Sequence, residues 1–107
     1  MPRYVALVFL GLLGLAGCAG SQYDQGRKLL SAQDYAGASA ALKGALAKDS
    51  SNVGVLVDLA EALYHQGELD QARVHLEKAR SLDPQNSKAV AILGLIHERR
   101  GELEAAI

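Results

Sequence analysis

Hydrophobic residues recur at helical spacing through the middle of the chain. Between Val53 and Gln66 they fall on one side of a helix, and a second such pattern runs from Leu69 to Leu82. Gly67 separates the two stretches, and Pro84 follows the second, where its ring cannot continue a helical hydrogen-bond ladder. The pattern therefore predicts two helices joined by a tight turn, with Gly67 as a left-handed cap of the first helix.

The same pattern appears on both sides of this central unit after a shift of 34 residues. The forward matches are Leu59 with Leu93, Gly67 with Gly101, Leu69 with Leu103 and Ala72 with Ala106, and the backward matches are Ala72 with Ala38, Leu76 with Leu42, Ala79 with Ala45 and Asp83 with Asp49. Self-similarity at this period indicates an array of helix-turn-helix units. The units are expected at about 19–52, 53–86 and 87–107, the last one incomplete.

The flanking units predict further helices. In the first unit we expect helices over 22–33 and 36–48, although the more polar 22–33 could instead be a partly frayed helix. In the third unit a helix over 87–100 should be followed by a turn at 101–102 and by a last helix that starts at Leu103. Because only one turn of that helix is present, this end is expected to belong to a longer array or to need a partner surface.

The central unit carries small and large apolar residues at the places where two helices must cross closely. These residues are Leu56, Leu59, Ala60, Leu63, Ala72, Leu76, Ala79 and Pro84. The unit resembles a tetratricopeptide repeat, with aliphatic residues replacing the usual aromatic ones. The resemblance implies an all-α helix-turn-helix solenoid of about two and a half repeats over 22–107. An ordinary bundle of helical hairpins is the alternative.

The first 20 residues have a different character from the rest. Arg3 is their only charged residue, and Val5 to Leu15 is an unbroken run of apolar residues and glycine. That run is too short for an ordinary membrane-spanning helix but suits the hydrophobic part of a secretory signal. It ends in Leu15-Ala16-Gly17-Cys18, which resembles a bacterial lipobox.

The lipobox resemblance implies a lipoprotein signal peptide over 1–17, a lipidated Cys18 and a short linker over 18–21. An uncleaved anchor, or an ordinary signal peptide cleaved near Ala16 or Ala19, would be the alternatives. Since Ala19 rather than an aspartate follows the cysteine, the resemblance favours the outer membrane, with the repeats facing the periplasm.

Charge and residue counts argue against several kinds of function. The net charge of −1 offers no basic surface for nucleic acid, and one cysteine excludes an intrachain disulfide. The histidines His65, His75 and His97 lack the four-residue spacing of a helical metal site, and no glycine-rich phosphate loop is present. His97 takes the place of Leu63 one repeat earlier and is expected to be half-buried. We therefore predict no catalytic residue, metal, cofactor or small-molecule substrate.

The resemblance also implies where a partner would bind. In tetratricopeptide arrays the first helix of each repeat lines a concave groove. The residues at the groove positions are Tyr23, Arg27, Leu30 and Ser31 in the first unit, Val57, Glu61, Tyr64 and His65 in the second, and Lys88, Leu95, Glu98 and Arg99 in the third. Tyrosine and arginine are frequent anchors at interfaces. Glu61 would repel a terminal carboxylate, which argues against a chaperone-type clamp.

These expectations combine into one functional hypothesis. By resemblance, a short lipoprotein of this build binds another envelope protein in its groove and helps to assemble a pilus, a secretion pore or a similar complex. Tethering by the lipid would raise the local concentration of the groove. An adaptor that recruits a periplasmic cell-wall enzyme is the alternative.

Overall fold

A computed structural model of the protein describes residues 19–105. The expected signal peptide over 1–17 and the lipid attachment at Cys18 lie outside these residues and stay predictions.

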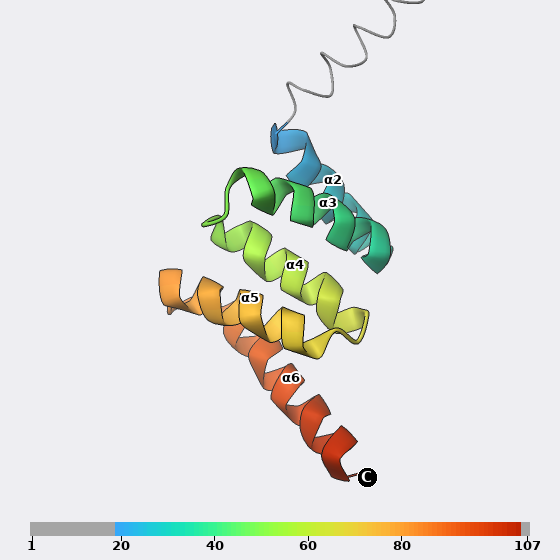
Figure 1. The fold of residues 1–107 in the computed structure, drawn as a ribbon, viewed down its shortest axis with the longest axis vertical. Coiled ribbons are helices and arrows are strands. Elements are labelled where there is room, and N and C mark those ends of the chain that lie inside the picture. The colour runs from blue at the N-terminus through green and yellow to red at the C-terminus, as the bar shows by residue number, and fades with distance from the viewer. Residues whose placement is uncertain (1–18, 106–107) are drawn as a thin grey trace, which may run out of the picture.

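The described chain folds into five consecutive α-helices. They are α2 (Ala19–Ser31), α3 (Tyr35–Lys48), α4 (Val53–His65), α5 (Leu69–Leu82) and α6 (Ser87–Ala105). Figure 1 shows them following one another from one end of the molecule to the other, with α2 packed on α3 and α4 on α5. The predicted all-α repeat solenoid is confirmed. The first helix begins at Ala19, so the expected linker is already helical from that residue.

Side-chain caps define where several of these helices start. The Asp34 carboxylate accepts a hydrogen bond from the Gly37 backbone N–H at 3.0 Å. The Asn52 side chain does the same for Val55 at 3.2 Å. These caps satisfy backbone donors that a helix start leaves without intrahelical partners.

The turns inside the first two repeats share one geometry. Gly67 has φ +83°, as predicted for a left-handed cap, and Glu68 then donates its N–H to the Leu63 carbonyl at 2.9 Å. Gln33 stands 34 residues earlier and has φ 63°, a conformation that a residue with a side chain rarely adopts. The repeat geometry therefore imposes this backbone conformation even where glycine is missing.

The core lies between the paired helices and holds the residues that the repeat pattern selects. Leu56, Leu59 and Leu76 have no exposed surface, and Ala60 and Ala72 let α4 and α5 approach each other. In the first repeat, a Cβ added to Gly26 would lie 2.6 Å from Cγ of the buried Leu42. Close packing of α2 on α3 therefore depends on this glycine.

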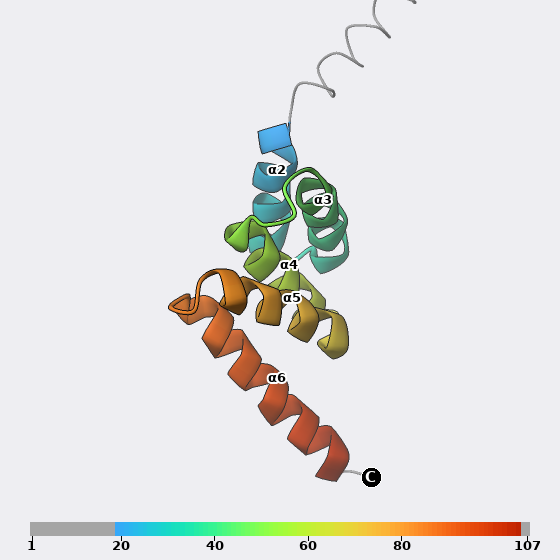
Figure 2. The same ribbon diagram turned by 60° about the vertical axis from the view of Figure 1, so that its left-hand side comes forward.

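The third unit differs from the prediction. Gly101 and Glu102 do not form a turn, because α6 continues to Ala105 and projects beyond the other helices (Figure 2). A turn would interrupt the helical backbone hydrogen bonds, and within the described residues no second helix packs on this end of α6 to offset that loss. His97 is exposed rather than half-buried for the same reason, since no second helix covers it within the described residues.

Candidate protein-binding groove

The first helices of the three repeats meet at one buried carboxylate, Asp58 of α4. Its Oδ2 accepts a hydrogen bond from the Tyr23 hydroxyl of α2 at 3.2 Å, and its Oδ1 lies 2.9 Å from Nζ of Lys88 of α6. Lys88 also lies 3.1 Å from Oε2 of Glu61. The Asp58 side chain is only 12% exposed, so these contacts compensate a charge that would be costly to bury alone.

The environment of this junction changes the pKa of both of its donors. The pKa of Tyr23 is raised above its ordinary value by partial burial, by the negative charge of Asp58 and by the hydrogen bond between Tyr23 and Asp58. Partial burial by itself would lower the pKa of Lys88, but its hydrogen bonds to Asp58 and Glu61 and their charges outweigh that effect and raise it. Both changes in pKa favour the protonated forms, which donate the hydrogen bonds to Asp58.

A glycine makes the contact between α2 and α4 possible. A Cβ built on Gly54 would overlap the Tyr23 hydroxyl oxygen. Any larger residue at this position would therefore push Tyr23 away from Asp58.

A cavity of about 530 Å³ opens on the wall formed by α2 and α4. Its lining consists of Tyr23, Arg27, Leu30, Ser31, Gln33, Tyr35, Asp58, Glu61, His65 and Lys88. Seven of these residues were predicted from the repeat positions, and the structure brings them together. The ring of Tyr35, which was not predicted, is stacked on His65 with the centroids 4.3 Å apart.

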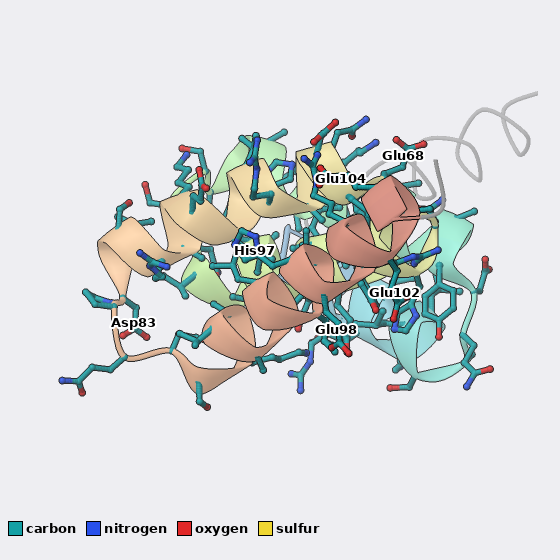
Figure 3. All side chains as sticks on the ribbon, turned by 90° about the horizontal axis from the view of Figure 1, so that it is seen from below. Glu68, Asp83, His97, Glu98, Glu102 and Glu104 are labelled. Atoms are coloured by element: carbon teal, nitrogen blue, oxygen red, sulfur yellow. The ribbon has the colours of Figure 1, made fainter. Side chains whose placement is uncertain are left out.

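A second cavity of about 380 Å³ lies between α4 and α6. It is lined by four predicted residues and one unpredicted residue, namely Tyr64, Leu95, Glu98, Arg99 and Glu102. Arg99 donates a hydrogen bond to the Tyr64 carbonyl at 3.2 Å, and its guanidinium lies 5.5 Å from the centre of the Tyr64 ring. Glu98 and Glu102 lie on the same side of α6, and Glu104 lies on the other side (Figure 3).

Two consecutive residues separate the cavities. His65 lines the first cavity and Tyr64 the second, and their rings meet edge to face with the centroids 5.3 Å apart. A ligand that occupied both cavities would cross this pair, which we call the Tyr64–His65 ridge.

The prediction for Val57 is wrong. Its side chain is 2% exposed and belongs to the core. Tyr23 holds the equivalent place on α2, the outermost helix of the described part, and keeps some exposure. Val57 lies on α4, which packs against both α2 and α6, so the neighbouring repeats cover it.

Asp58 was the main residue that the sequence analysis missed. The available signal was a single carboxylate inside the otherwise apolar stretch from Val53 to Ala60. Asp58 and Glu61 lie about one helical turn apart on α4, and this spacing lets the ammonium group of Lys88 contact both carboxylates.

The described residues show neither a metal centre nor a membrane span. Over 19–105 no group of three or more His, Cys, Asp or Glu side chains could hold a metal ion. Within the same range, each helix is too short or too polar to cross a bilayer.

A comparison with protein families agrees with this architecture. Residues 29–96 match a family model described as a tetratricopeptide repeat. The chain belongs to the tetratricopeptide-repeat family. Repeats of this family generally mediate protein–protein interaction and are typically non-catalytic scaffolds. A search among curated proteins found no match for the chain.

Proposed function

We propose that this chain is a membrane-anchored scaffold that holds an envelope protein in the groove formed by α2, α4 and α6. The observation that carries the proposal is the convergence of the two cavities on one wall, on either side of the Tyr64–His65 ridge. That wall offers aromatic rings, the exposed Leu95 and charged groups, a combination suited to a protein segment with apolar and polar contacts.

The anchor part of the proposal rests on the sequence before α2. The lipobox-like Leu15-Ala16-Gly17-Cys18 ends directly where α2 begins at Ala19. A lipid on Cys18 would therefore hold the first repeat close to the membrane. Confinement to that surface raises the effective concentration of the groove toward partners in the same envelope. Its role would be to position a subunit of a pilus, a secretion system or a similar assembly at the outer membrane.

Membrane fractionation tests the anchor. One acyl chain binds a membrane only marginally, whereas two or more hold a protein stably. The wild-type chain should therefore stay with membranes through high-salt washing, and Cys18→Ser should accumulate as an unprocessed precursor. Wild-type protein in the soluble periplasm at normal levels would rule out the lipid anchor.

Site-specific photocrosslinking in cells tests the partner. A photoreactive amino acid is placed at Leu95 in the groove or at Leu82 on α5, two leucines with 45% and 47% exposure. We expect the photoreactive amino acid at position 95 to capture one envelope subunit that the same group at position 82 does not capture. Mass spectrometry would identify the captured subunit. Capture of a cell-wall hydrolase at position 95 would favour the role of an adaptor for a cell-wall enzyme over the assembly role. Equal capture at both positions would contradict the groove as the binding site.

A further inference from the structure

The α2 end of the groove carries an excess of positive charge. Arg27 lines both the first groove cavity and an adjoining shallow cavity on α2, which Lys28 and the single carboxylate of Asp24 also line. All three residues are exposed. The Arg27 guanidinium lies 5.7 Å from the centre of the Tyr23 ring. This end therefore favours a negatively charged side chain of a partner.

The middle of the groove has the opposite balance. Asp58 and Glu61 share the one ammonium group of Lys88, at 2.9 and 3.1 Å. Two carboxylates against one cation leave an excess of negative charge on α4. A second acidic side chain from a partner would meet repulsion here, which limits the acidic preference to the α2 end.

The α6 end is also negative. Glu98 and Glu102 lie one turn apart on the same side of the helix (Figure 3), and Arg99 between them is turned to the Tyr64 ring and carbonyl. The exposed Leu95 lines the same cavity. An occupant of this end therefore gains most from a long side chain with an aliphatic stem and a positive head, as in lysine or arginine.

We propose that the groove takes a linear protein segment whose charge order is opposite to its own. An acidic side chain lies over Arg27 and Lys28, an apolar or aromatic side chain crosses the Tyr64–His65 ridge, and basic side chains lie over Glu98 and Glu102. This inference rests on the proposed groove function and adds the chemistry and orientation of the ligand.

The charges at the two ends determine orientation more than affinity. Exposed ion pairs contribute little each, because water screens them. A segment bound in the reversed direction would lose both sets of pairs and would also place like charges together at both ends, so the two directions differ by more than the pairs themselves contribute. The polarity of the groove thus selects one binding direction.

Selection from a random displayed-peptide library tests the inference without a known partner. The full chain is immobilised in mild detergent, and bound peptides are sequenced. We expect enriched peptides to carry acidic residues near one end and Lys or Arg near the other. Arg27→Glu together with Lys28→Glu should remove the acidic preference, and Glu98→Lys with Glu102→Lys should remove the basic one. Each pair should weaken a wild-type-selected peptide about three- to tenfold.

A matched charge reversal on α5 serves as the control. Lys78→Glu changes an exposed residue outside both groove cavities and should leave the selected pattern unchanged. Enriched peptides that lose binding with Tyr64→Ala but show no charge order would overturn this inference and leave the groove function standing. If the library yields no peptide sensitive to Tyr64→Ala, the groove function itself is contradicted.

Discussion

The second and third repeats share one sequence pattern around their turn but have different structures. In the second repeat, Leu56 and Leu63 are buried beneath α5. The residues 34 positions later are Val90, which is 50% exposed, and His97, which is also exposed. The face of α6 that corresponds to the covered face of α4 is therefore only partly covered in the described chain: Leu93, the equivalent of Leu59, is 6% exposed, whereas Val90 and His97 are open.

The turn glycines of the two repeats differ in the same way. Gly67 has a left-handed backbone and closes the hairpin, whereas its equivalent, Gly101, lies inside helix α6. A glycine at the turn position of a repeat allows a turn but does not by itself produce one. The turn forms only when the residues after the glycine make a helix long enough to bury a face of the helix before it, because that burial offsets the hydrogen bonds lost at the turn.

The largest difference in stability should appear when the side chains at the equivalent positions Leu56 and Val90 are truncated. Leu56→Ala removes a fully buried side chain and should lower the free energy of unfolding by about 2–5 kcal/mol. Val90→Ala should change it by less than about 0.5 kcal/mol, because the side chain is half exposed on a helix. Urea denaturation followed by circular dichroism measures both. Similar losses at the two positions would mean that α6 is covered in solution.

A second helix placed after the turn residues of the third unit should make that unit resemble the second repeat. We would replace residues 103–107 by a copy of the α5 sequence followed by a polar capping helix, so that the copy starts directly after Gly101 and Glu102. The added interface should raise the melting temperature by at least about 5 °C. The same extension with its apolar positions made polar is the control. A chain that is monomeric, cooperative and unchanged by the extension would show that α6 needs no such neighbour.

The turn glycines should respond with opposite signs to the same substitution. Gly67→Ala should destabilise the protein by about 1–2 kcal/mol, the cost of a left-handed conformation for alanine. Gly101→Ala should stabilise it by about 0.5–1 kcal/mol, since alanine is the better helix former. An added Cβ meets nothing within 4 Å at either site, so packing does not confuse the comparison. In the extended chain, Gly101→Ala should become destabilising.

A small effect on stability is expected at the turn of the first repeat. Gln33→Gly relieves the positive φ of Gln33, and part of the gain is lost to the greater freedom of glycine in the unfolded chain. The net stabilisation should be about 0.5–1 kcal/mol. Gln33→Ala retains the positive φ and is the control. Stabilisation by alanine as large as that by glycine would show that backbone strain is not the cause.

Most of the fold could be predicted because the same packing and turn requirements recur in each repeat and select the same residue types every 34 residues. The period, the small residues at the helix crossings and Gly67 are local features of the sequence. The prediction of a turn at Gly101 was wrong because a turn forms there only if a further helix buries a face of α6, and the residues around Gly101 do not determine this.

The groove was predictable in position but not in detail. Repeat positions indicated most of the residues that line the two cavities. They gave Val57 the same role as Tyr23, although neighbouring repeats cover one and not the other. Asp58 was missed because its significance comes from Lys88, which lies 30 residues away in the sequence and reaches it only in the folded chain.

The most direct test of the groove compares two leucines of nearly equal exposure. Leu95 lines the second cavity, whereas Leu82 ends α5 outside it, and their exposed fractions are 45% and 47%. Titration calorimetry with the subunit captured by crosslinking would measure the affinity of each alanine variant. Leu95→Ala should weaken binding by about fivefold or more, and Leu82→Ala should leave it within about twofold. Equal losses, or a larger loss for Leu82→Ala, would contradict the assignment of the partner to the wall formed by α2, α4 and α6.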